Sequence, residues 1–354
     1  MGTDVPPDIK SLQQFVTDAV GRILYEESFP KRSDLANALV TLIDGVSKYF
    51  EEGKRLFPEI IATTTIDFFS QLPSPRIVTI MNSCEISEVE FKKGLKRCAP
   101  LAVDGWVIFF EIREADMRYG LVSVESSELS PSLYDHTVGV LKLAERTFPV
   151  LYIQNIGPEV VRLKGVNSEI HVCLNLATHQ DTTDEQLGKL ISHMVVTSDP
   201  SIRQSTTNYL RRTFEYSLRL CHGCLIGIVE ASPEALKKLR ESIDDAVYLE
   251  NPIDIDELVR NFNDNRNVEA SINLKSYKNI VLGMINSDGI TIITTDSKVI
   301  AYNAFIKNSH TKSTDRAHGG ARKRAYLTMI SSACFICCYF QSQDGQAEIW
   351  SETK

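Results

Sequence analysis

The residues best suited to chemistry lie between positions 286 and 350, where one acidic side chain and a basic triplet occur in a single stretch. Asp288 lies in a turn before a β-branched run, a pattern typical of a buried strand. Arg322, Lys323 and Arg324 follow two glycines and begin a segment with helical periodicity. A carboxylate can bind a divalent metal ion, and clustered cations can hold phosphate groups. The combination indicates a site for a phosphorylated ligand and a metal ion.

The basic triplet is unfavourable for the helix that it begins. Residues 322–330 contain good helix formers with an apolar face, so the triplet forms the first helical turn. A helix N-terminus already carries partial positive charge, and a bound anion such as phosphate would remove the conflict. The alternative is a solvated basic face. The preceding Gly319 and Gly320, which permit close backbone approach, and the upstream Asp288 favour the phosphate site.

The pattern around these residues predicts strands interleaved with helices, hence an α/β sheet covered on its faces. A polar surface loop is expected over residues 308–318, between the second strand of a hairpin and the helix of the basic triplet. The strands are expected at residues 225–229, 290–294, 298–302 and 333–340. The helices are expected at residues 234–243, 255–262, 276–285 and 322–330, the first capped by Ser232 and the second by Asp254.

These motifs resemble the diadenylate cyclase domain of the DNA-integrity scanning protein and its membrane-bound relatives. That family carries an Asp-Gly-Ala turn before a strand, matched here by Asp288, Gly289 and Ile290. It also carries Gly-Thr-Arg-His-Arg at a helix start, matched by the run from Gly320 to Arg324. The resemblance covers roughly the last 150 residues, a normal domain size. Three residues depart from the family pattern, namely Lys323 for His, Ala321 for Thr and Ile290 for Ala.

The resemblance implies a nucleotidyl cyclase that condenses two ATP molecules into the second messenger cyclic di-AMP with Mg²⁺ or Mn²⁺. Asp288 would bind the metal ion, and Asp344, in a later polar turn, would be a second metal contact. The triplet would hold the triphosphate. The nucleotide site would be lined by Gly289, Gly319, Gly320, Ala321, Arg322 and Arg324. Because each subunit of the family supplies one ATP, a head-to-head dimer or higher homo-oligomer is expected.

A second hypothesis is a catalytically impaired, nucleotide-binding regulatory protein. Lysine at position 323 supplies a point charge instead of a titratable imidazole, and Ala321 lacks the threonine hydroxyl. Such a protein would keep the phosphate site and lose turnover. Asp288 weighs against this hypothesis, because phosphate binding alone does not require that carboxylate.

The sequence of residues 1–200 predicts a separate mixed α/β domain, and it contains no recognisable catalytic motif. We expect a sensor or assembly domain with an unidentified ligand, joined by a Ser/Thr-rich linker at residues 197–207 to a cyclase-like domain at 205–354. The alternative is that this first domain holds the main activity. Its helices are expected at residues 7–26, 34–54, 87–97, 133–146 and 184–196. Its strands are expected at residues 60–69, 77–81, 106–112, 119–124, 150–155, 160–164 and 169–176.

Composition restricts the remaining possibilities. The net charge of −8 and pI near 5.5 argue against a general nucleic-acid binder. No apolar run reaches the ~18 residues of a membrane span, and no secretory signal is visible, so a soluble cytoplasmic protein without a membrane partner is expected. The eight cysteines are expected to be reduced. Cys-x-x-Cys spacings at 221/224 and 334/337 would bind zinc only if distant segments converged, so core thiols are favoured.

Overall fold

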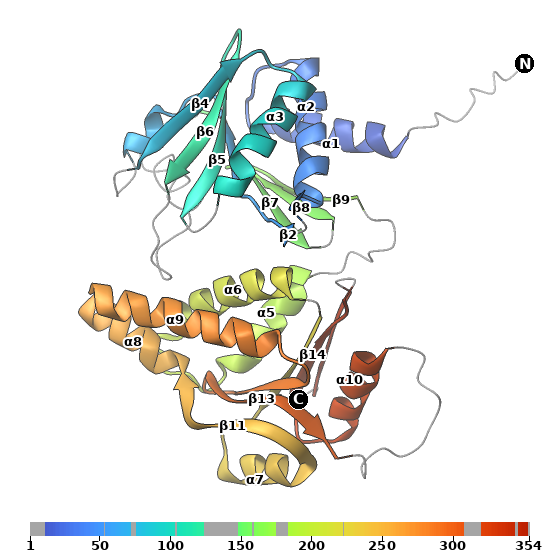
Figure 1. The fold of residues 1–354 in the computed structure, drawn as a ribbon, viewed down its shortest axis with the longest axis vertical. Coiled ribbons are helices and arrows are strands. Elements are labelled where there is room, and N and C mark those ends of the chain that lie inside the picture. The colour runs from blue at the N-terminus through green and yellow to red at the C-terminus, as the bar shows by residue number, and fades with distance from the viewer. Residues whose placement is uncertain are drawn as a thin grey trace, which may run out of the picture. The chain divides into compact units, whose positions relative to one another are not determined.

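A computed structural model describes residues 11–52, 54–71, 76–102, 105–123, 148–157, 159–174, 183–221, 223–307, 320–343 and 346–352. The described residues up to 174 form one compact unit, and those from 183 onward form a second (Figure 1). Each unit contains one large mixed sheet with helices against it. The expected mixed α/β class is therefore confirmed.

The first unit is built on a seven-stranded sheet in the order β4-β6-β5-β3-β7-β8-β9. Among the strands that the structure describes here, β3 and β5 pair in parallel and the other neighbouring pairs are antiparallel. The strands are β3 (Ile60–Thr63), β4 (Val78–Cys84), β5 (Trp106–Ile112), β6 (Met117–Ser123), β7 (Val150–Gly157), β8 (Val160–Lys164) and β9 (Glu169–Cys173). A short hairpin of β1 (Phe50–Glu51) and β2 (Lys54–Arg55) stands apart from this sheet.

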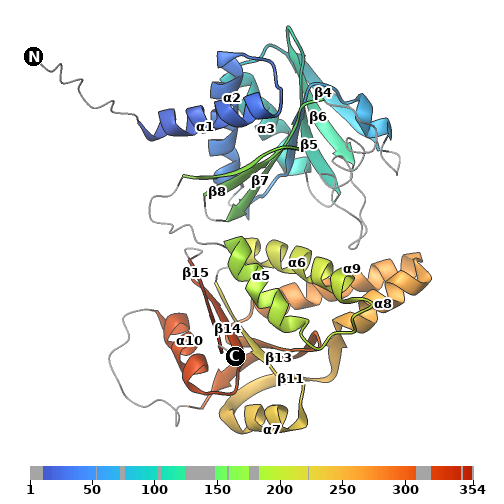
Figure 2. The same ribbon diagram turned by 180° about the vertical axis from the view of Figure 1, so that it is seen from behind.

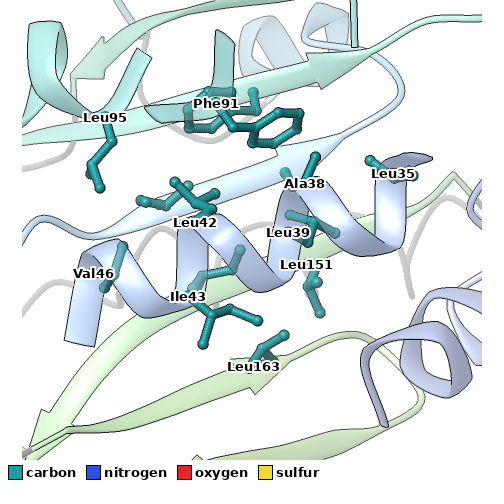
Figure 3. Packing of buried hydrophobic residues seen from close by; sticks show 14 of the residues in the cluster. Leu35, Ala38, Leu39, Leu42, Ile43, Val46, Phe91, Leu95, Leu151 and Leu163 are labelled. Carbon is teal, nitrogen blue, oxygen red and sulfur yellow. The ribbon is translucent and has the colours of Figure 1, made fainter. Parts of the chain in front are cut away.

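Among the described residues, three helices pack on one face of this sheet, namely α1 (Leu12–Glu26), α2 (Ser33–Ser47) and α3 (Glu88–Cys98). The apolar side of α2 lies between α3 and the strands, where Leu39 and Leu42 are fully buried near Phe91 and Leu151 (Figure 3). The opposite face carries a smaller cluster around Phe68 and Phe69 from the 3₁₀ helix η1 (Asp67–Gln71). A second 3₁₀ helix, η2 (Ala99–Leu101), follows α3.

The second unit has a six-stranded sheet in the order β11-β13-β12-β10-β14-β15, with β10 and β12 parallel. Its strands are β10 (Cys224–Val229), β11 (Ile243–Asp254), β12 (Ile290–Thr294), β13 (Lys298–Ile306), β14 (Cys337–Gln341) and β15 (Ala347–Ser351). Its helices are α5 (Thr183–Met194), α6 (Arg203–Leu220), α7 (Pro233–Ser242), α8 (Ile255–Asn265), α9 (Val268–Ile285) and α10 (Ala321–Ser331).

The central strand β10 shows how this sheet is covered on both faces. Ile226 and Ile228 point into a core shared with α5, α6, α8 and α9, whereas Leu225 and Val229 point into a core shared with α7 and α10. Figures 1 and 2 show these helix groups on the two sides of the sheet. Because both faces are buried, the strand is apolar throughout rather than alternating.

Several predicted boundaries differ from the observed elements. The second helix ends at Ser47 rather than near 54, because the chain turns into the β1–β2 hairpin. The strand expected at 60–69 ends at Thr63 and gives way to η1. The edge strand β11 was not predicted, because most of its residues are exposed and they do not alternate between buried and exposed positions. The expected helix at 133–146 lies outside the described residues.

The predicted linker also differs. Helix α5 packs into the core of the second unit, so the division falls before residue 183 rather than near 200. Residues 197–198 are fixed to the β12–β13 turn, where the amide of Thr197 donates to the carbonyl of Thr295 (3.0 Å) and the hydroxyls of Ser198 and Ser297 lie 3.0 Å apart. Helix α6 begins at Arg203. Among the described residues, none of the helices is long and apolar enough to cross a membrane.

Candidate functional site

Asp288 lies in the tight connection between α9 and the buried strand β12. Gly289 follows it with φ +87°, in the left-handed region that favours glycine. A Cβ atom at this position would lie 2.8 Å from the backbone carbonyl carbon of Asn303 on β13, so a side chain would collide with the neighbouring strand. The turn therefore fixes the backbone at Asp288 while leaving its side chain 85% exposed.

The basic triplet occupies the first turn of α10, as the sequence predicted. Gly320 is the N-cap residue, and no side chain in the described part of the chain caps the helix. Its first turn contains no acidic residue. Arg322 and Lys323 are partly buried, whereas Arg324 is exposed. The N-terminus of α10 therefore presents peptide N–H groups beside three cations, an arrangement that favours an anionic ligand.

Asp288 and Arg322 come together although 34 positions separate them. One guanidinium nitrogen of Arg322 donates to Oδ1 of Asp288 at 3.2 Å. Exposed ion pairs of this kind contribute about 1 kcal/mol or less, so a phosphate group can replace the carboxylate on Arg322. The contact forms because strand β12 and helix α10 both begin at the same end of the sheet.

Arg322 also packs against the loop that leads into β10. A Cβ atom at Gly223 would lie 3.1 Å from Nη1 of Arg322 and 2.8 Å from the carbonyl oxygen of Gln341. Gly223 has φ +91°, so glycine satisfies both the backbone geometry and the close approach of the guanidinium group. Gly223 was not predicted as a site residue; its place within Cys-x-Gly-Cys was the available signal.

Lys323 points to a different carboxylate from that of Arg322. Its ammonium group forms an ion pair with Glu348 on β15 and lies over the rings of Tyr326 and Phe340, at 5.2 and 5.4 Å from their centroids. These two rings stack with centroids 5.6 Å apart. Burial, with a smaller contribution from Glu348, raises the pKa of Tyr326. Lys323 is thus held by a half-exposed carboxylate of the same chain and by an aromatic surface.

Glu348 was missed by sequence reasoning. It lies opposite Phe340 in the β14–β15 pairing, which places its carboxylate on the face covered by α10. Only the register of this hairpin reveals that position. The hairpin turn is closed by Ser342, whose amide donates to the carbonyl of Gln346 at 2.8 Å and whose hydroxyl accepts from the Gln346 amide at 3.0 Å.

The remaining predicted site residues divide into two groups. Ala321 and Gly320 are exposed at the start of α10 beside Arg322. Gly319 and Asp344 lie outside the described residues, so the predicted second metal contact has no described position. Within the described part of the chain, no three acidic, histidine or cysteine side chains form a metal-binding cluster. Of the two predicted metal ligands, Asp288 is the one that the structure describes.

The chain matches no protein-family model, no curated protein and no solved structure.

Proposed function

We propose that the second unit is a metal-dependent nucleotidyl cyclase that condenses two ATP molecules into cyclic di-AMP. The observation that carries this proposal is the 3.2 Å contact between Asp288 and Arg322, at the end of the sheet where α10 begins. A carboxylate beside a cation at a helix N-terminus provides one group for a metal ion and another for a triphosphate. The diadenylate cyclase resemblance supplies the choice of ATP and of a cyclic product.

Nucleotidyl transfer requires a 3′-hydroxyl aligned with an α-phosphorus and a stabilised pyrophosphate leaving group. In the proposed reaction the hydroxyl oxygen of one ATP forms a bond to the α-phosphorus of the other, and pyrophosphate leaves. A second, equivalent step closes the ring. Arg322 would exchange Asp288 for the triphosphate, and Arg324, which is exposed on the same turn, would reach its outer oxygens. A bound Mg²⁺ or Mn²⁺ would neutralise phosphate charge and favour ionisation of the hydroxyl.

Each chain would position one ATP, so the proposed reaction needs two chains facing one another. The exposed positions of Asp288 and Arg324 support this arrangement, because both side chains are accessible to a second nucleotide. The first unit would act as a sensor or assembly domain that controls the pairing.

The second candidate function is a regulatory protein that binds ATP without turnover. The ion pair of Lys323 with Glu348 favours it, because a cation already neutralised within the protein contributes less to holding a leaving group. The exposed carboxylate of Asp288 favours the enzyme.

Incubation of the full chain with ATP and Mn²⁺ or Mg²⁺, followed by separation of the nucleotides, distinguishes the two functions. The enzyme hypothesis predicts a cyclic or linear dinucleotide that disappears in Asp288→Asn. The dinucleotide product should persist in the control Asp264→Asn, which makes the same charge change at an exposed position on α8. Bound but unchanged ATP would support the regulatory protein instead.

A further inference from the structure

Strand β11 lies at one edge of the six-stranded sheet of the second unit. It pairs with β13 along one side, and in the described part of the chain no strand pairs with its other side (Figure 1). With 12 residues it is about twice as long as an average strand. Because the backbone N–H and C=O groups along an unpaired edge lack partners in the sheet, such an edge can accept another extended segment.

The exposed side chains of β11 are acidic on both sides of an apolar centre. Asp244 and Asp245 are exposed before the centre, and Glu250 is exposed after it. Between them, Val247 and Tyr248 are 44% and 38% exposed. The strand contains four acidic residues and no basic residue. Since side chains of paired strands lie opposite one another, a complementary segment has an apolar centre between positive charges.

The same charges disfavour a second copy of this chain as the partner. Antiparallel self-pairing centred on Val247 would place Asp244 opposite Glu250, and like charges directly opposite one another destabilise a sheet. The chain also carries a net charge of −8, which adds repulsion between copies. A basic segment has the opposite preference, because it replaces this repulsion with attraction.

An acidic cavity of about 370 Å³ continues this surface beyond the end of β11. It is lined by Asp254, the last residue of the strand, and in total by five carboxylates and two cations, a net charge of −3. The two cations pair with three of these carboxylates at 2.9 to 3.3 Å. Among the described residues, Asp256 and Glu257 have no cationic partner, so the cavity favours a lysine or arginine side chain.

We propose that β11 and this cavity bind an extended, basic segment of another protein. The segment adds a strand to the edge of the sheet, and its backbone N–H and C=O groups pair with those of β11. Its lysine and arginine side chains meet the carboxylates, and an apolar residue at its centre contacts Val247 and Tyr248. Backbone pairing supplies the affinity, and charge selects basic over acidic segments. This surface does not depend on the proposed nucleotidyl transfer.

The test uses the full-length protein and the fluorescently labelled peptide Lys-Arg-Thr-Val-Thr-Val-Arg-Lys at physiological ionic strength. A second peptide has the same side chains and charge, but its four central backbone nitrogens are methylated and cannot donate hydrogen bonds. We expect the unmodified peptide to bind on the order of tenfold more tightly, because several backbone hydrogen bonds are lost in the methylated one. It should also protect the amides of residues 244–250 from hydrogen exchange. Equal affinities of the two peptides, or no binding of either, would overturn the proposal.

A charge variant tests whether the peptide lies along β11. Asp245→Asn should raise the Kd of the unmodified peptide about 1.4- to 5-fold, the range expected for one exposed ion pair. Asp264→Asn makes the same charge change at an exposed position on α8 and should leave the Kd unchanged. Equal Kd values for these variants would contradict the assigned surface. Protection of the β11 amides that grows with protein concentration in the absence of peptide would assign the edge to a second copy and overturn the proposal.

Discussion

Replacing Glu348 by glutamine should strengthen binding of ATP. The Glu348 carboxylate competes with phosphate for Lys323, and the two side chains of this pair are 50% and 25% exposed. Partly exposed pairs contribute about 0.2–1 kcal/mol. Removing the competing charge while keeping the side-chain shape should therefore lower the Kd for a non-hydrolysable ATP analogue about 1.4- to 5-fold. The cation–π contacts with Tyr326 and Phe340 would continue to hold the lysine near the helix.

The assay is calorimetric or fluorescence titration of the analogue with Mg²⁺ at two salt concentrations. Glu352→Gln is the matched control, because it makes the same change in net charge at an exposed residue directly after β15. The gain in Glu348→Gln should exceed that in Glu352→Gln and diminish at high salt. Equal Kd values for the two variants, or weaker binding in Glu348→Gln, would refute a role for Lys323 in phosphate binding.

Three further predictions concern stability. Glu27→Gln should destabilise the first unit by about 2–4 kcal/mol in a denaturant titration. The buried Glu27 carboxylate accepts hydrogen bonds from the amides of Val166, Asn167 and Ser168, all at 2.8 Å. The control Glu26→Gln, at the exposed neighbouring position, should change the stability little. Gly289→Ala should cost about 1–3 kcal/mol of unfolding free energy from its φ of +87° alone, and an unchanged melting temperature would contradict the described turn. Burial lowers the pKa of His193 from its usual 6.5, so the unfolded chain binds this proton more tightly. The contribution of neutral His193 to the stability of the second unit is present above pH 6.5 and is lost as the pH falls below 6.5. Denaturation curves at several pH values should show this pH dependence in the wild-type protein and lose it in His193→Gln.

The sequence predicted much of the second unit, because local signals agree with the final structure. Ser232 and Asp254 cap α7 and α8 as expected, accepting the amides of Ala235 and Glu257. The turn at Asp288 and the hairpin of β12 and β13 follow from glycine and β-branched residues. These features depend on neighbouring residues, and sequence periodicity records them directly.

The parts that were missed depend on contacts between distant segments. The exposed strand β11 is ordered by pairing with β13, as between Tyr248 and Ala301, and its own pattern does not show a buried face. The partner of Lys323 was missed because Glu348 reaches it only through the register of β14 and β15. Such pairings are fixed by tertiary structure and cannot be obtained from spacing in one sequence.

The rate of dinucleotide formation from ATP, measured as Mn²⁺ is titrated into the full-length protein, tests the proposed nucleotidyl transfer most directly. We expect a metal-dependent product whose formation is lost in Asp288→Asn and strongly reduced in Arg322→Gln, while both variants remain folded. A metal-dependent dinucleotide formed at the wild-type rate by Asp288→Asn, or no product from the wild-type protein at any metal concentration, would contradict the proposed transfer.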